Sequence, residues 1–297
     1  MAVQGFKTVV EYVEESEFGT FPTDPAMQWI GLVDIVKPVI KPKTETKRYL
    51  AANASTNRLE KLMNVKVGEE IGLELEYYPQ SLPGFLQYFI GSATGLADDL
   101  ASVSVGIIHK GSGEYMTLSG LVGEEVTLEI PEDGVVKVSA RLVGADATDP
   151  STSDYIGLGS HAAEDSTEPL TWEDVSNVQM NYGAGFVSVE DYVSSIEIRV
   201  RNELKVIKDI GDTKASRIVA IKPVSREVTL GLEMNYDDLD MLLKVRSLTE
   251  LGFKFTIGGK TFTLSGVKFP ELPTEFSPDD LVGDKITSLP VTGLTIA

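Results

Sequence analysis

Apolar and polar residues alternate along most of the chain, in runs that end at Gly, Pro or Asp. A period of two is typical of strands that bury one face, and runs of β-branched residues also favour strands. In the first half we predict strands at 30–40, 65–77, 103–109, 114–121, 125–130 and 135–143. In the second half we predict strands at 193–207, 216–224, 227–235, 252–257, 260–268 and 286–295.

Two short segments favour helix instead, at 81–91 (SLPGFLQYFIG) and 237–247 (DDLDMLLKVRS). In the second segment Asp237 can cap the helix N-terminus. Other residues of that segment recur at helical spacing: Leu239, Leu242, Leu243 and Arg246. Several strands for each helix predict a mainly β protein, a sandwich or open barrel with a helix packed against it.

The chain also repeats itself. GLELEY (72–77) is matched by GLEMNY (231–236), and MTLSG (116–120) is matched in the same order by FTLSG (262–266). Repeats in one order, with similar strands and helices around them, predict a duplicated unit. The expected division is an N-terminal segment (1–27), a first β unit (28–144), a connecting segment (145–188) and a second β unit (189–297).

The connecting segment is rich in Ser, Thr, Asp, Gly and Pro, which favour turns and loops. We expect some local order around Trp172 and Tyr182. More than forty residues is long for a bare connection, so the segment is expected to pack on one unit or to become ordered in an assembly.

Composition narrows the function. The chain has 297 residues, with 26 Lys and Arg against 45 Asp and Glu and a formal net charge of −19, which argues against broad neutralisation of nucleic-acid phosphates. It has no cysteine, which excludes disulfides, thiol nucleophiles and Cys-ligated metals, and its two histidines are too few for a His-rich metal site. No signal-peptide pattern and no long apolar run is present, so we expect no membrane span.

The charge is distributed unevenly. Residues 37–66 hold eight basic and two acidic residues, and residues 197–227 hold eight basic and five acidic ones. Both segments are expected to form long hairpins, and one interpretation is that their basic side chains are simply solvated. The other is that a basic hairpin docks on an acidic surface of another copy. The candidates for such contacts between chains or rings are Lys43, Lys47, Arg48, Arg58, Lys61, Lys208, Lys214 and Arg217.

Catalytic chemistry has little support in the sequence. No phosphate-binding loop, nucleophile elbow, zinc-protease motif or EF-hand loop is present. The acidic pairs at 98–99, 237–238 and 279–280 are interpreted as caps and turns, His109 as a strand-end residue, and His161 as part of the polar connection. Aromatic residues near the first helix are expected in the core: Tyr77, Tyr78, Phe85, Tyr88 and Phe89. We therefore predict no enzyme activity, no metal and no cofactor.

Residues 14–32 (EESEFGTFPTDPAMQWIGL) resemble the opening of tail tube proteins of long-tailed bacteriophages and archaeal viruses. The resemblance rests on a glutamate, an aromatic-Gly-Thr and a proline before the first strand, here Glu17, Phe18, Gly19, Thr20 and Pro22. The later order of basic hairpin, Gly-Leu-Glu strand, short helix, TLSG strand, acidic loop and final strand is also similar to that family. The resemblance therefore extends over most of the chain.

The resemblance implies two tandem β-sandwich or open-barrel units, each with one short flanking helix and a long projecting hairpin. It implies rings stacked into a tail tube, three two-unit chains imitating six units, and a channel for genome delivery. Abundant Asp and Glu would allow an acidic channel lining. The implied partners are further copies, the tape measure, tail tip and terminator proteins, and viral DNA passing without sequence-specific binding. The implied location is the virion tail, assembled in the host cytoplasm.

Two other classes stay open at this point. One is a different structural β-protein, such as a sheath, baseplate, fibre or surface-layer subunit. The other is an acidic carbohydrate-binding module or glycosidase, which would need a cleft with paired carboxylates and stacked aromatic side chains.

Overall fold

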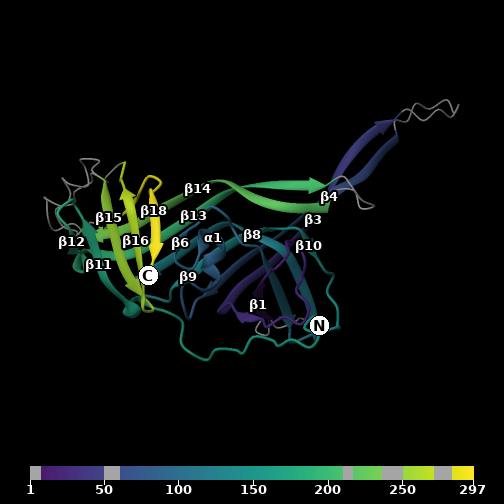
Figure 1. Ribbon diagram of the computed structural model, residues 1–297, viewed down its shortest axis with the longest axis horizontal. Coiled ribbons are helices and arrows are strands. Elements are labelled where there is room, and N and C mark those ends of the chain that lie inside the picture. Colours follow the sequence, from purple (N-terminus) through teal and green to yellow (C-terminus); the bar gives the residue numbers. More distant parts are fainter. Residues whose placement is uncertain (1–7, 50–60, 210–216, 236–249, 271–282) are drawn as a thin grey trace.

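The computed structural model describes residues 8–49, 61–209, 217–235, 250–270 and 283–297. Within these residues the chain is mainly β, and its strand ladders are antiparallel (Figure 1). The predicted fold class is confirmed at this level. The second expected helix, at 237–247, lies outside the described residues.

The large sheet of the described residues has eleven strands, and seven of them form one continuous surface. In spatial order these are β3 (Leu32–Tyr49), β4 (Lys61–Tyr78), β9 (Lys137–Gly144), β8 (Glu114–Pro131), β13 (Val193–Asp209), β14 (Arg217–Asn235) and β17 (Gly283–Thr287). The first half of β8 pairs instead with β7 (Val103–His109), β7 with β1 (Thr8–Glu14), and β1 with β2 (Gln28–Trp29). The short β10 (Asp146–Ala147) also pairs with the first half of β8.

The structure corrects three strand boundaries. The predicted strands at 114–121 and 125–130 are one strand, β8, whose ladder shifts register at Gly123. Gly120 has a φ of 64°, so the strand changes direction without a break. The predicted strands at 216–224 and 227–235 are likewise one strand, β14. Conversely, the predicted strand 286–295 is two, because Pro290, which lacks an N–H, lies between β17 and β18 (Gly293–Ile296).

The second sheet combines strands from both halves of the chain. Its order is β12 (Phe186–Ser188), β11 (Val175–Asn181), β15 (Leu251–Ile257), β16 (Lys260–Val267), β18, β6 (Gly95–Leu96) and β5 (Gly91–Ser92). Strands β11 and β12 come from the expected connecting segment, which also contains a 3-10 turn (Trp172–Asp174). A second 3-10 turn (Glu190–Tyr192) follows just after that segment. The sheet therefore crosses the sequence boundaries at 144 and 188, and the division into two units stays a prediction.

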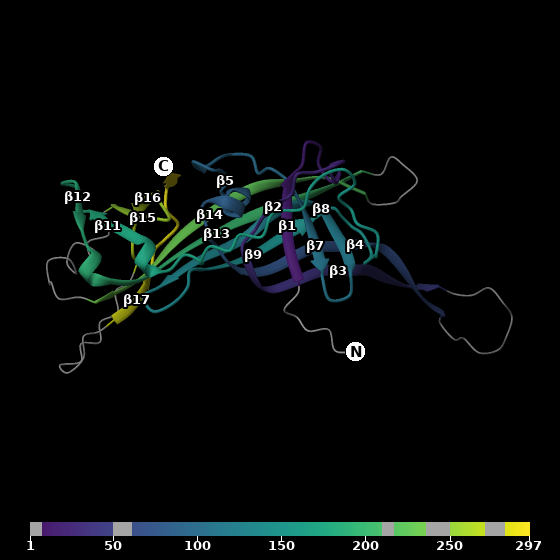
Figure 2. The same cartoon turned by 90° about the horizontal axis from the view of Figure 1, so that it is seen from below.

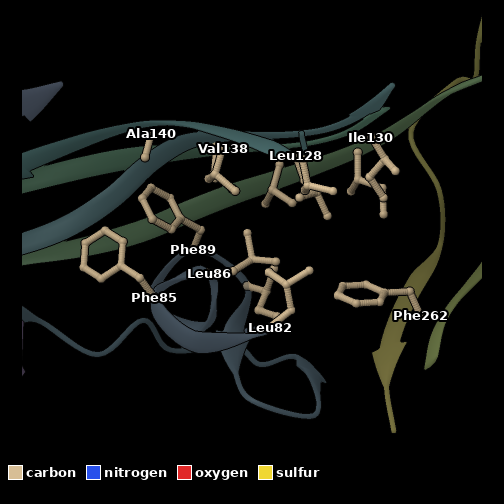
Figure 3. Packing of buried hydrophobic residues seen from close by; sticks show 14 of the residues in the cluster. Leu82, Phe85, Leu86, Phe89, Leu128, Ile130, Val138, Ala140 and Phe262 are labelled. Carbon is tan, nitrogen blue, oxygen red and sulfur yellow. The ribbon is translucent and has the colours of Figure 1, made fainter. Parts of the chain in front are cut away.

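The predicted helix at 81–91 is confirmed as a 3-10 turn (Gly84–Leu86) followed by α1 (Gln87–Ile90). Figure 3 shows Leu82, Phe85, Leu86 and Phe89 directed at the side chains of β8 and β9, with Phe262 of β16 closing one end. Burying such side chains stabilises the fold by about 1.5–3 kcal/mol each. Of the five aromatic residues expected in the core, four are buried, whereas Tyr78 is partly exposed and donates a hydrogen bond to Asp34.

Two long hairpins dominate the outline of the molecule. One is formed by β3 and β4 and the other by β13 and β14. In two perpendicular views both run towards the same end of the molecule, and the hairpin of β3 and β4 extends beyond the body there (Figures 1 and 2). The layered core, with α1 and the second sheet, lies on one side of the large sheet, and the other side of that sheet is exposed.

Candidate assembly surfaces

The two hairpins have register shifts at corresponding positions. The ladder of β3 and β4 shifts register between Val33 and Ile35 and again between Lys43 and Thr44. The ladder of β13 and β14 shifts between Val193 and Ser195 and again between Glu203 and Leu204. The two shifts have the same spacing in each hairpin, so Val33 corresponds to Val193 and Lys43 to Glu203.

This register places the sequence repeat on corresponding strands but not on corresponding residues. Gly72 lies in β4 and Gly231 in β14, each the second strand of its hairpin. The shifts align Gly68 with Ser225 and Tyr77 with Met234, so Gly72 corresponds to Thr229. The glycine motifs are therefore two residues out of alignment, which keeps the same face buried because side chains alternate with a period of two.

The candidate contact residues lie towards the ends of these hairpins. Lys43 is exposed, and its Nζ lies 3.9 Å from Oε2 of Glu70 in the same chain. Lys47 and Arg48 occupy the end of β3, Lys61 begins β4, and Arg217 begins β14. Lys208 is exposed near the end of β13. Arg58 and Lys214 lie outside the described residues. A role of these residues in contacts between chains stays a prediction.

The long surface of the large sheet has two open edges among the described residues. Strand β3 pairs only with β4, and β17 pairs only with β14. Leu32, Ile35 and Ile40 of β3 are exposed. Such an edge is a template for pairing with another chain. The edge strand also contains Pro38 and Pro42, which reduce the number of N–H donors it can offer.

A row of alternating charges crosses six strands on the exposed face of the large sheet, and we call it the charged belt. Successive cross-strand partners are Lys37, Glu74, Arg141, Glu125, Arg201 and Glu227. Lys37 Nζ donates to Glu74 Oε2 at 2.7 Å, and this bond lowers the pKa of Glu74. Arg199, next to the belt, donates from Nε to Glu125 at 2.6 Å. The belt carries three charges of each sign, so this face is locally balanced in an acidic protein.

A groove of about 560 Å³ lies on the same face at the end of β8 and β13. Glu129 and Glu197 face each other across these strands, and Lys137 and Lys285 also line the groove. Lys285 forms an ion pair with Glu197. Tyr78 is the single aromatic residue among the described residues that line the groove. The groove therefore lacks the stacked aromatic side chains that carbohydrate binding would need.

Two acidic residues, Glu11 in β1 and Glu15 directly after β1, have structural roles that sequence analysis missed. Glu11 is fully buried and accepts hydrogen bonds from Tyr155 Oη at 2.7 Å and from the backbone N–H of Ala162 at 2.8 Å. His161 Nδ1 lies 2.8 Å from Glu11, and its Nε2 lies 3.0 Å from Asp154. Burial alone would lower the pKa of His161, but its bonds to these two carboxylates raise it. Together these contacts hold the connecting segment on the outer side of β1.

Glu15 organises the opening motif. It accepts hydrogen bonds from Ser104 Oγ at 2.6 Å and from the backbone N–H groups of Gly120 at 2.6 Å and Gly19 at 2.8 Å. Gly19 has a φ of 71°, a conformation that favours glycine. Glu11 is buried and Glu15 is partly buried, and the sequence pattern does not contain the distant partners of either carboxylate.

The sequence of the chain matches a known protein family. A family model described as phage tail tube protein matches residues 5–293, which is essentially the whole chain. The chain belongs to the phage tail tube protein family. The comparison with curated proteins gave no match. Tail tube proteins are structural components of the virion, and this membership confirms the resemblance drawn from residues 14–32 and the later strand order.

Other site classes can be examined on the same residues. No group of three or more His, Asp or Glu side chains that could hold a metal ion occurs in the described part of this tail tube protein. No helix in that part is long and apolar enough to cross a membrane. His109 ends β7, as predicted for a strand-end residue, and Asp98 and Asp99 lie in a bend.

Proposed function

We propose that this tail tube protein assembles into rings that stack into the tail tube, the channel through which the viral genome reaches the host. The observation that carries the proposal is the arrangement of the large sheet. Within the chain, β8 of the first half pairs with β13 of the second half, and among the described residues β3 and β17 have open edges. A similar strand pairing between neighbouring chains would continue the sheet from one chain to the next. Closing the sheet into a ring would then leave neither of these two edges unpaired.

The proposed ring contains three chains. The matching register of the two hairpins supports two similar units per chain, so three chains would supply six units around the axis. Its partners would be further copies of the chain and other tail proteins, such as the tape measure, tail tip and terminator. The protein would act as a structural component without enzyme activity, and assembly would take place in the host cytoplasm.

The exposed face of the large sheet is the proposed channel lining. Its other face packs against α1 and the second sheet, so that bulk would lie on the outside of a closed ring. The charged belt would then face the DNA. Basic and acidic side chains alternate along the belt, so this proposed lining would be less acidic than the one that composition allowed.

Negative-stain microscopy and sedimentation of concentrated protein test the proposal. Stacked rings with three chains each are expected. Rings with six whole chains would exclude the trimer and leave the tube intact. Compact monomers at all concentrations, in the presence of a preformed tail tip, would overturn the assembly itself.

A further inference from the structure

Two polar residues of the second hairpin join it to the first half of the chain. Asn202 of β13 is 2% exposed and lies opposite Arg226 of β14. Its Nδ2 donates to the backbone carbonyl oxygens of Phe89 at 3.0 Å and Gly123 at 2.9 Å. Its Oδ1 accepts from Nε of Arg226 at 2.6 Å. Both N–H donors and the oxygen of this side-chain amide therefore have hydrogen-bond partners inside the protein.

Arg226 continues the same network. Its Nη1 donates to the carbonyl oxygens of Ile90 at 2.8 Å and Ala97 at 2.7 Å. Burial lowers the pKa of the guanidinium, which the carboxylate of Asp98 partly offsets. The carbonyl groups at the end of a helix lack partners within the helix, and here α1 ends at Ile90. The pair Asn202 and Arg226, which we call the clamp, therefore adds hydrogen bonds to carbonyl groups of the first half. Among these, the carbonyl oxygen of Ile90 also accepts from the backbone N–H of Ala97 at 3.0 Å.

The first hairpin has different residues at the corresponding place. The shared register shifts align Asn202 with Pro42 and Arg226 with Glu69, and these two residues are again cross-strand partners. Proline has no side-chain donor, and a carboxylate only accepts hydrogen bonds. Docked on the same site, the Glu69 carboxylate would face carbonyl oxygens, whose partial negative charge repels it.

We propose that the clamp reserves the edge of β8 for the chain's own second hairpin, and that Pro42 and Glu69 exclude the first hairpin of another copy from that edge. This proposal rests on the proposed self-assembly and adds which hairpin pairs with the edge of β8. Strand β3 has an open edge and the same register as β13, so it is the natural competitor for β8. In a ring the first hairpin of a neighbouring chain is also at high local concentration. The covalent connection between β8 and β13 would therefore, by itself, select poorly between that hairpin and the chain's own second hairpin.

Engineered disulfides report which hairpin occupies β8, because the natural chain has no cysteine. Thr127 of β8 lies directly opposite Arg199 of β13, and Arg199 corresponds to Val39 of β3. Opposed residues have Cα atoms about 4.5–5.5 Å apart, a separation that a disulfide spans. The full chain with T127C and R199C reports native pairing within one chain. The full chain with T127C and V39C reports pairing of the first hairpin with another copy.

With natural residues at 69 and 226 we expect the first reporter to close within the chain and the second to stay monomeric. Exchanging the charges by Glu69→Arg and Arg226→Glu should slow the first reporter and produce disulfide-linked dimers from the second. The ratio of the two products should change about tenfold or more, since hydrogen bonds to a charged group are worth at least that factor. The matched control is Lys205→Glu with Glu70→Arg, which exchanges charges on the same two hairpins. Lys205 is exposed and lies beyond the residues of β13 that pair with β8, so this control should leave the ratio unchanged.

An unchanged ratio in the exchanged chain would overturn the proposal, as would equal dimer yields in the exchanged and control chains. Should circular dichroism show that Arg226→Glu does not fold, Arg226→Gln with Glu69→Gln removes both charges, and the same ratio decides. The reporters are measured on unassembled chains, so they are independent of whether rings form. Sedimentation of the parent tests ring formation separately.

Discussion

At the scale of single residues, the fold depends on a few buried or partly buried polar groups whose partners lie far away in the sequence. Glu11 bonds to residues of the connecting segment about 150 positions later, and Glu15 bonds to Ser104 and Gly120. A buried carboxylate without such partners would be costly. These residues therefore fix how the N-terminal strand and the connecting segment pack on the body.

The bond network of His161 predicts a pH dependence. Because its pKa is raised in the folded chain, protonation favours the folded state. This contribution is complete below about pH 6.5, the usual pKa of histidine, and is lost as the pH rises through the raised value. Glu11, Asp154, Tyr115 and Tyr155 surround the ring. Urea unfolding of the parent and of His161→Gln should therefore differ most near pH 6 and least at alkaline pH.

The other histidine provides the control for this measurement. His109 contacts the Thr8 hydroxyl at 3.2 Å, and within the described part of the chain its ring makes no hydrogen bond to a carboxylate. The change His109→Gln makes the same substitution at an imidazole that does not contact Glu11 or Asp154, so it is the matched control. A constant difference between the parent and His161→Gln across the whole range would contradict the role assigned to His161.

Glu15 gives a second prediction at this scale. Replacing it by Ala leaves two backbone N–H groups and one hydroxyl without their acceptor, which should cost about 1–3 kcal/mol of unfolding free energy. Glu17 of the same motif is exposed, so Glu17→Ala should change stability by no more than about 0.5 kcal/mol. Urea denaturation of both variants distinguishes the two roles, and equal effects would show that Glu15 is not the organising residue.

At the scale of elements, alternation of apolar and polar residues identified most strands, because it records which face of a strand is buried. It failed where one strand serves two surroundings. Strand β8 pairs with β7 in its first half and with β13 in its second, and the glycines at 120 and 123 looked like a turn. The clamp was missed for a related reason. Asn202 and Arg226 look like ordinary polar residues of a basic hairpin until α1 is placed beside them.

The close contact between β8 and α1 makes Gly123 sensitive to substitution. A Cβ atom at Gly123 would lie 2.4 Å from Cδ1 of Phe89, a core residue. Gly123→Ala should therefore destabilise the fold by about 1–3 kcal/mol, the usual cost of overpacking. At Gly134 the nearest atom to an added Cβ is Pro131 Cγ at 3.3 Å, so Gly134→Ala is the matched control. Thermal unfolding measures both changes, and a stable Gly123→Ala chain would argue against tight packing here.

At the scale of the whole molecule, the two hairpins and the two open edges of the described large sheet provide contact surface that the core of the same chain does not bury. The family and the mainly β fold could be predicted from the sequence because they depend on short motifs and on alternation. The boundaries between units could not be predicted from the sequence. Strands β5 and β6 of the first half belong to the second sheet, and so does β11, which precedes the expected second unit. Sequence order alone does not determine which sheet a strand completes.

The basic hairpin gives the prediction for assembly. Replacing Lys43, Lys47 and Arg48 together by Glu should reduce tube yield while the subunit stays folded. Each exposed ion pair is worth only about 0.2–1 kcal/mol, but a ring repeats it around its circumference. Raised ionic strength should weaken the parent tube in the same direction, because the Debye length falls to roughly 3 Å at 1 M salt. Sedimentation measures the yield, and circular dichroism checks the fold.

The control carries the same change of charge on the body of the molecule. Lys110, Lys254 and Lys268 lie away from the hairpins, so replacing them by Glu should affect tube yield less. Equal tube yield from the parent and a folded hairpin variant would mean that these hairpin residues are merely solvated.

The charged belt has a consequence for motion along the proposed channel. The electric field of alternating charges fades over a distance set by its repeat, which here is two strand spacings, roughly 10 Å, giving a decay length of about 1.5 Å. A polyanion separated from the wall by even one layer of water would sense almost no individual charge. The wall would be electrically smooth, so displacement along it would meet neither traps nor barriers of appreciable height.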